Sequence, residues 1–449
     1  MMNRVRKFTV FFMIIFFASG WSQENHAQQN EFEQNPPLNK NEYAQGDSAK
    51  YPHPNTIPYK TRKSFFTHVL SFPATVWRLV WTPIGETTIW VEQNRIHQKA
   101  INFFLNDDLS AGVFPLVSLG GNTGAGAGLR AFHNNLFNRG KKINFTVLYS
   151  TSDNNSASLA YSDSAAFGSA LYLNFKGEMF NDSNENLFIS RDAGLAVLLQ
   201  SALGANLSSL EDETSYATEQ FSARVDLGYA INRKIGLGIT SSLKRAEIES
   251  GTGKGGEFFP REVLGEGVTK LFSIGSTLTF DFRHGWPRTL SGTFVRFGFQ
   301  INREMDGSRF KYNKLSAEIQ QFVPIPFFAK NRRLAIRGRI EKLDRLEGKQ
   351  IPFYELSMLG SSSTLRGYDQ NRFRGKGSLL FNFEYRYPVW DAWDAVIFVD
   401  EGQVFDDYED IRLDAFHFGI GTGLRFMSSR GFIARVEVGF SNETARALF

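Results

Sequence analysis

Residues 295–302 read Val-Arg-Phe-Gly-Phe-Gln-Ile-Asn, and this stretch decides the fold because every second residue is apolar. A period of two places the apolar side chains on one face of a β-strand and the other side chains on the opposite face. The second face here carries Arg296, Gln300 and Asn302. In a membrane barrel the apolar face meets lipid and the polar face lines the lumen.

The same alternation recurs along the chain from about Ala111 onward. Clear examples are residues 171–176, 223–229, 334–339, 381–387 and 432–440. Such segments run to about ten residues or more, whereas strands of soluble sandwiches are nearer five or six. We therefore predict an all-β fold, a transmembrane antiparallel β-barrel of about 16 strands. Turn signals at 153–155, 181–183 and 429–431 are expected to separate the strands.

The composition fits a barrel and excludes other classes of protein. The chain has 449 residues, of which 14% are aromatic, and its mean hydropathy is −0.27. No apolar run after the N-terminus reaches the ~18 residues of a membrane helix, whereas the two faces of a barrel strand average to neutral hydropathy. The absence of cysteine excludes disulfides and a thiol nucleophile. A dispersed net charge of +4 does not indicate a nucleic-acid partner.

The N-terminal part of the chain divides into three segments before the barrel. Basic residues at 4, 6 and 7, an apolar run at 8–18 and small residues at 18–20 predict a cleaved signal peptide over 1–20, while a membrane anchor would need a longer run. Residues 21–63 are polar and predict a disordered linker. Residues 64–105 predict short amphipathic helices, which either lie at the membrane interface, dock a periplasmic partner or pack on the barrel. The barrel is expected over 106–449.

Three spaced motifs lie in the C-terminal third of the chain. They are Leu-Arg-Gly-Tyr at 365–368, Asn-Phe-Glu-Tyr-Arg-Tyr-Pro at 382–388 and Phe-Val-Asp-Glu-Gly at 398–402. Their order resembles the barrel of the bacterial surface antigen family, the outer-membrane assembly-factor superfamily that includes the BamA and TamA proteins. The resemblance covers about residues 101–449, and it implies that the loop bearing the first motif folds back into the lumen.

The resemblance also implies a structural lock around this inner loop. Arg366 would pair with Glu384 and Asp400, Gly367 would allow a tight bend, and Tyr368 would pack against the inner wall. A guanidinium in a narrow lumen needs carboxylate partners, and its planar fork can bind two of them. Phe449 would be the aromatic C-terminal assembly signal of such barrels. Because Val396 and Phe398 share the nominal face of Asp400, we also expect a bulge near residues 401–402.

Two departures from the family bear on function. POTRA domains, the periplasmic modules of family members that insert proteins, are not expected between the signal peptide and the barrel. The segment 444–449 is short for a closing strand, which predicts either a truncated last strand or a weak seam against the first strand. We expect an outer-membrane protein that assists insertion or translocation of proteins or lipids; a passive channel or structural barrel is the alternative. Expected partners are outer-membrane lipid, client outer-membrane proteins and a separate POTRA-bearing periplasmic protein.

The sequence offers no catalytic or cofactor site. Neither a Gly-x-Ser-x-Gly nor a His-Glu-x-x-His motif occurs, so an enzyme such as a lipid hydrolase is not expected. His417 shares the lumen phase of its segment and is interpreted as a lining residue. The acidic pairs at 107–108 and 406–407 lack calcium-loop spacing and are interpreted as solvated turns. We therefore predict neither a cofactor nor a bound metal.

Overall fold

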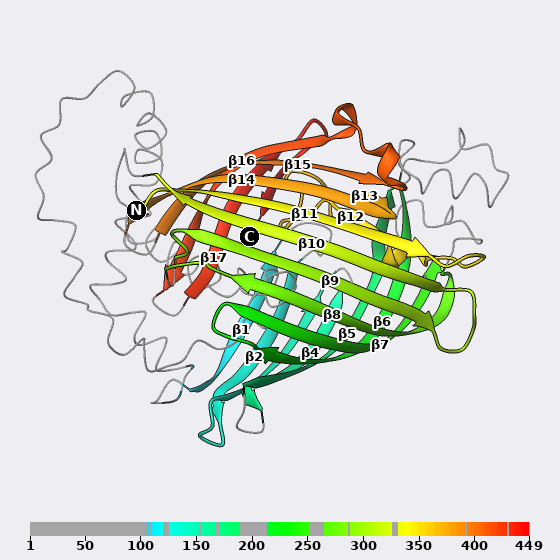
Figure 1. Cartoon of the computed structure of the whole chain (residues 1–449), viewed down its shortest axis with the longest axis horizontal. Coiled ribbons are helices and arrows are strands. Elements are labelled where there is room, and N and C mark those ends of the chain that lie inside the picture. Colours follow the sequence, from blue (N-terminus) through cyan, green and yellow to red (C-terminus); the bar gives the residue numbers. More distant parts are fainter. Residues whose placement is uncertain are drawn as a thin grey trace, which may run out of the picture.

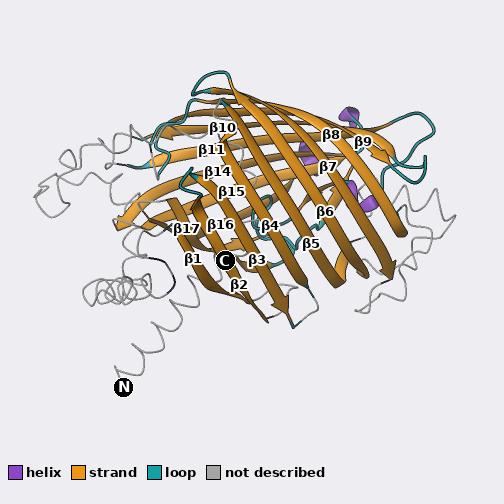
Figure 2. Ribbon diagram, turned by 90° about the horizontal axis from the view of Figure 1, so that it is seen from below, coloured by secondary structure: helices purple, strands orange, loops and turns teal. Residues whose placement is uncertain are grey.

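In the computed structural model, one long antiparallel sheet follows the order of the chain and curls into a barrel (Figure 1, Figure 2). The structure describes residues 104, 106, 110–119, 125–151, 154–166, 170–188, 213–250, 265–285, 288–325, 331–390, 393–428 and 431–448. The sheet has 16 strands in the order β1 to β11 and then β14 to β18, which confirms the predicted fold class and strand number. Strands β1 and β18 stand at its two edges. No helix among the described residues is long and apolar enough to cross a membrane.

The strands of the sheet have the following bounds. The first eight are β1 (Ala111–Leu119), β2 (Ala125–Leu136), β3 (Lys141–Ser150), β4 (Asn155–Ala166), β5 (Leu171–Phe188), β6 (Glu213–Ala230), β7 (Ile235–Ser250) and β8 (Gly267–Asp281). The others are β9 (Gly292–Glu304), β10 (Lys311–Pro324), β11 (Arg333–Arg345), β14 (Gly377–Trp390), β15 (Trp393–Phe405), β16 (His417–Ser428), β17 (Gly431–Phe440) and β18 (Ala445–Leu448).

Alternation along the strands separates an apolar outer face from a polar inner face. In β9, for example, Phe297 and Phe299 are exposed, whereas Asn302 is buried. Exposed apolar side chains form a belt over neighbouring strands, which is the surface that lipid requires. Its members include Phe145, Val225, Leu227, Ile239, Leu243, Ile274, Leu315 and Ile319.

The connections differ between the two ends of the barrel. Because each strand is antiparallel to the next, the connections 189–212, 251–266, 346–376 and 406–416 share one end, which we call the loop end. The shorter connections 137–140, 167–170, 231–234 and 391–392 share the other end, the turn end, with the start of β1. Long loops at one end and short turns at the other are typical of outer-membrane barrels.

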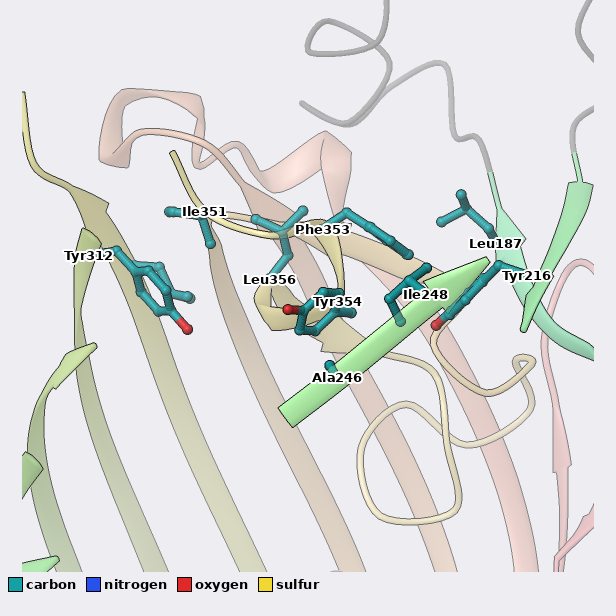
Figure 3. Packing of buried hydrophobic residues seen from close by; sticks show 10 residues of the cluster. Leu187, Tyr216, Ala246, Ile248, Tyr312, Ile351, Phe353, Tyr354 and Leu356 are labelled. Carbon is teal, nitrogen blue, oxygen red and sulfur yellow. The ribbon is translucent and has the colours of Figure 1, made fainter. Parts of the chain in front are cut away.

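Residues 346–376 form the inner loop, which enters the lumen between β11 and β14. It contains a 3₁₀ turn, Phe353–Glu355, and a two-stranded ribbon of β12 (Ser357–Leu359) and β13 (Phe373–Gly375). Near the loop end its apolar side chains pack on the inner wall (Figure 3). The members of this cluster are Leu187, Tyr216, Ala246, Ile248, Tyr312, Leu343, Ile351, Phe353, Tyr354 and Leu356.

One predicted turn is wrong, and several predictions fall outside the described residues. Asn181, Asp182 and Ser183 do not form a turn but lie inside β5, where the pairing with β6 shifts register between Asp182 and Glu185. At 18 residues β5 is longer than the ~9–11 residues that cross a membrane, so polar residues near its loop end are tolerated. The signal peptide, the linker, most of the segment 64–105 and Phe449 lie outside the described residues.

Candidate functional site

The inner loop carries Arg366 to the wall formed by β14, β15 and β17. The guanidinium binds Asp400 through two parallel hydrogen bonds, Nε to Oδ2 at 2.7 Å and Nη2 to Oδ1 at 2.7 Å. Its Nη1 lies 2.7 Å from Oε1 of Glu384. The structure thus brings together the three charged residues that the motifs singled out. All three are buried, with side-chain exposures of 3%, 0% and 9% for Arg366, Asp400 and Glu384.

A third carboxylate, missed by the sequence reasoning, completes the site. Glu437 on β17 is fully buried, and its Oε2 lies 3.0 Å from Nη1 of Arg366. Its other oxygen, Oε1, accepts a hydrogen bond at 2.8 Å from Nε of Arg425 on β16. The only available sequence signal was its position in the lumen phase of the alternating segment 432–440.

Further arginines surround the carboxylates of the cluster. Arg425 also reaches Oε1 of Glu384 at 2.9 Å, and Arg386 donates through Nε to Oε2 of Glu384 at 2.7 Å. Nη1 of Arg435 lies 3.9 Å from Oε2 of Glu437, so four guanidinium groups face three carboxylates, Glu384, Asp400 and Glu437. A buried charge without partners is strongly destabilising, so this pairing allows these charges to be held in the lumen wall.

The ring of Phe398 packs against Arg366, and the inward position of Phe398 bears on one prediction. The guanidinium carbon of Arg366 is 3.5 Å from the centre of the Phe398 ring, a close cation–π contact. Val396, Phe398 and Asp400 all face inward and are buried, and the pairing of β15 is regular through residues 401 and 402 on both sides. The predicted bulge there is wrong, because the inner loop supplies cover for apolar side chains on the inner face.

Glycines let the backbone of the loop touch the wall. Gly367 has φ +96°, a conformation that L side chains rarely adopt, and a Cβ there would lie 2.9 Å from the carbonyl carbon of Phe440. On the opposing wall, a Cβ at Gly439 would lie 2.7 Å from the backbone nitrogen of Gly367. A Cβ at Gly419 would overlap the carbonyl oxygen of Arg366. The Arg-Gly pair therefore sits against bare backbone of β16 and β17.

Beyond Arg366 the loop holds the turn between β17 and β18. The Tyr368 hydroxyl shares its single proton between Oδ1 of Asn442 at 2.7 Å and the carbonyl oxygen of Phe418 at 3.2 Å. The Ser441 hydroxyl donates to the carbonyl oxygen of Gly367 at 2.9 Å. Arg372 forms a forked ion pair with Glu443, with Nε–Oε2 2.8 Å and Nη2–Oε1 3.1 Å. We call this set of contacts the hairpin clasp.

A second anchor fixes the loop near the loop end of the barrel. Glu355 accepts a hydrogen bond from Nζ of Lys244 at 2.7 Å and another from the Tyr312 hydroxyl at 3.0 Å. Burial raises the pKa of the Glu355 carboxyl, but Lys244 and Tyr312 outweigh burial and hold that pKa below its ordinary value. The loop is thus fixed by charge at two depths.

His417 faces the inner loop. Its ring stacks on Phe373 with centroids 3.7 Å apart and meets the edge of Tyr368 at 5.9 Å. This packing between two aromatic rings fits the role of a lining residue for His417. Within the described part of the chain, no group of three His, Asp or Glu residues is arranged to hold a metal ion.

The fold and the site define a transmembrane β-barrel whose inner loop is fixed in the lumen by ion pairs. The Omp85 superfamily domain matches residues 135–443, and the chain belongs to that superfamily, which confirms the resemblance drawn from the motifs. Omp85 barrels are outer-membrane proteins.

One solved structure supports the fold, and two others are similar at lower TM-scores. BamA from Haemophilus ducreyi lacking POTRA domains 1–3 is similar with a TM-score of 0.52 at 14% identity, over 75% of this chain and 66% of that one. CdiB from Acinetobacter baumannii has a TM-score of 0.44 at 14% identity, over 77% of this chain and 55% of that one. CdiB from Escherichia coli has a TM-score of 0.47 at 13% identity, over 74% and 58%. The chain thus spans just under two thirds of that BamA chain, and less of the two CdiB chains.

Proposed function

We propose that this barrel assists the insertion or translocation of proteins or lipids at the outer membrane, through the seam between β1 and β18. The observation that carries the proposal is the short pairing that holds β18, one of the two edge strands of the seam. β18 pairs with β17 at four positions, from Phe440↔Ala445 to Glu437↔Leu448, whereas β1 pairs with β2 at nine. Among the described residues, β1 and β18 are not paired with each other.

The unpaired strand edges of the seam are costly because they lie in the hydrocarbon of the membrane. In hydrocarbon an unpaired strand edge leaves N–H and C=O groups unsatisfied, at several kcal/mol each. Such an edge is relieved by pairing with a strand from another chain, and it perturbs the lipid beside it until it is paired. Both effects serve a barrel that helps other molecules enter the membrane.

The partners in this proposal are outer-membrane lipid, client outer-membrane proteins and a separate periplasmic protein that bears POTRA domains. No catalytic step is included. A passive channel or a purely structural barrel is the alternative. The packing of the inner loop against β5, β6, β7 and β10 near the loop end does not favour a wide pore (Figure 3).

Reconstitution tests the proposal directly. The purified full-length chain is placed in liposomes, and a urea-denatured eight-stranded outer-membrane barrel is added as the client. We expect its heat-resistant folded form to appear faster than in liposomes carrying a passive porin at equal density. An equal rate would contradict the proposal. Depletion in cells is the companion test: normal assembly of other barrels and surface lipid, with only small-solute uptake reduced, would favour the channel.

A further inference from the structure

The backbone hydrogen-bonding groups along the free edge of β1 are not equally available to a partner strand. β1 pairs with β2 from Ala111↔His133 to Leu119↔Ala125, and among the described residues no strand pairs with its other edge. In an antiparallel pair, successive residues direct their N–H and C=O groups alternately toward the partner and away from it. Which residues of β1 face away therefore decides what the free edge offers.

Two independent contacts fix this direction. The backbone N–H of Asn134 on β2 donates to the carbonyl oxygen of Ser110, the residue opposite it when the register is continued. Residue 110 and the even-numbered residues of β1 thus face β2, and residues 111, 113, 115, 117 and 119 face the free edge. In agreement, both polar backbone groups of Ala111 are bonded away from β2, to Asn106.

Asn106 occupies the backbone hydrogen-bonding groups of Ala111, the first residue of β1 that faces the free edge. The N–H of Ala111 donates to Oδ1 of Asn106 at 2.8 Å, and the N–H of Asn106 donates to the carbonyl oxygen of Ala111 at 3.0 Å. Asn106 is itself held by a hydrogen bond from Nδ2 to Oγ of Ser110 at 3.1 Å. Phe104 packs on Phe114 with ring centroids 5.7 Å apart, so both Phe104 and Asn106 contact residues of β1.

Pro115 is the third residue of β1 that faces the free edge, and it offers no backbone donor there. Proline has no backbone N–H, so at a position that faces the free edge it removes a donor without disturbing the pairing with β2. Proline on an exposed edge is one of the devices by which proteins prevent unwanted strand addition. Val113 lies between the two closed positions, which leaves an uninterrupted stretch only at residues 116–119, toward the loop end.

We propose that β1 accepts a partner strand only along residues 116–119, and that Asn106 and Pro115 close the rest of its edge. This inference rests on the proposed function and specifies where a client pairs. The partner is an amphipathic strand of a client outer-membrane barrel. Strands β1 to β3 expose Val113, Leu129 and Phe145, and an added strand continues that apolar belt only if every second residue is apolar.

Site-specific photocross-linking in the reconstituted full-length chain tests the inference. Benzoylphenylalanine is placed at residue 113 or residue 119, which share one phase of β1, while the urea-denatured eight-stranded barrel folds. We expect client cross-links at 119 to exceed those at 113 by about three- to tenfold, the effect of about one net backbone hydrogen bond. Equal yields at the two positions would overturn the inference.

Variants of the edge sharpen the test. In the double variant Asn106→Ala, Pro115→Val, the cross-link at 113 is expected to rise to the level at 119; an unchanged yield contradicts the inference. Val117→Pro removes another edge donor while leaving the β2 pairing intact, and it is expected to lower the cross-link at 119 by about three- to tenfold. The heat-modifiable gel mobility of each variant shows that its barrel has folded.

The outcomes separate this inference from the proposed function. If client folding is accelerated but position 119 cross-links only to β18 or to a second copy of the chain, the client strand is the wrong occupant and the proposed function still stands. If neither acceleration nor any client cross-link is found, both fail.

Discussion

Arg366 and Asp400 are joined three times. Two hydrogen bonds of 2.7 Å run from the guanidinium to the carboxylate, and the backbone N–H of Arg366 donates to the same Oδ2 at 3.1 Å. One carboxylate on β15 thus fixes both the side chain and the main chain of the inner loop. Asn382 supports it by donating from Nδ2 to Oδ1 of Asp400 at 2.7 Å and to the carbonyl oxygen of Thr364 at 2.8 Å.

Arg366→Ala is expected to weaken the barrel. The substitution leaves buried carboxylates at Glu384, Asp400 and Glu437 short of a cation, and breaking a buried pair costs about 3–5 kcal/mol. The folded form should therefore lose its gel mobility at a lower temperature than the unsubstituted chain. Arg412→Ala is the control, because Arg412 pairs with Asp414 at the exposed surface. Equal heat resistance of Arg366→Ala and the unsubstituted chain would refute a locking role.

Glu437→Gln is expected to act through Arg366. The carboxylate accepts from both Arg366 and Arg425, and hydrogen bonds to charged groups contribute about 1.5–3 kcal/mol each. Because Arg366 and Glu437 belong to one network, combining Glu437→Gln with Arg366→Ala should destabilise the barrel by less than the sum of the single effects. Urea unfolding of the four proteins in this double-mutant cycle measures the difference. Strict additivity would show that the contact has no energetic weight.

The sequence predicted the barrel because lipid and lumen impose opposite demands on neighbouring residues of a strand. The contact of Arg366 with Glu384 and Asp400 was implied by the resemblance to the family that these spaced motifs carry. Glu437 was out of reach, since many lumen-phase residues are charged and only the curvature of the sheet selects the one that meets a loop residue 71 positions away.

Two predictions were wrong because both relied on local composition alone. The bulge near 401–402 was expected because apolar Val396 and Phe398 would be unfavourable on a water-exposed inner face. The inner loop covers that part of the lumen wall and buries both side chains. Asn, Asp and Ser at 181–183 suggested a turn, yet the strand there extends beyond the length needed to cross the membrane. In both places a distant segment or the membrane boundary outweighs local propensity.

Gly367→Ala is expected to dislodge the loop. The residue has φ +96°, and the new methyl group would meet the backbone of Phe440 at 2.9 to 3.1 Å. Backbone strain of this kind costs about 1–3 kcal/mol before any clash is counted. Gly348→Ala is a matched control with φ +65° and nothing within 4 Å of its Cβ, so it carries strain without a clash. Heat resistance on gels should fall further for Gly367→Ala, and equal losses would show that close approach to β17 is unimportant.

Tyr368→Phe is expected to loosen the hairpin clasp without disturbing the charged cluster. The ring keeps its packing on Phe373, while the hydrogen bonds to Asn442 and to the Phe418 carbonyl are lost. A net loss of about 1 kcal/mol corresponds to about fivefold faster amide exchange in residues 441–448, if opening of this hairpin governs exchange. Hydrogen exchange of peptides from that region measures the change, with exposed Tyr408→Phe as the control. Exchange that is unchanged by Tyr368→Phe would mean that the hydrogen bonds of the Tyr368 hydroxyl do not restrain β18, and that any restraint by the inner loop comes from Ser441 and Arg372.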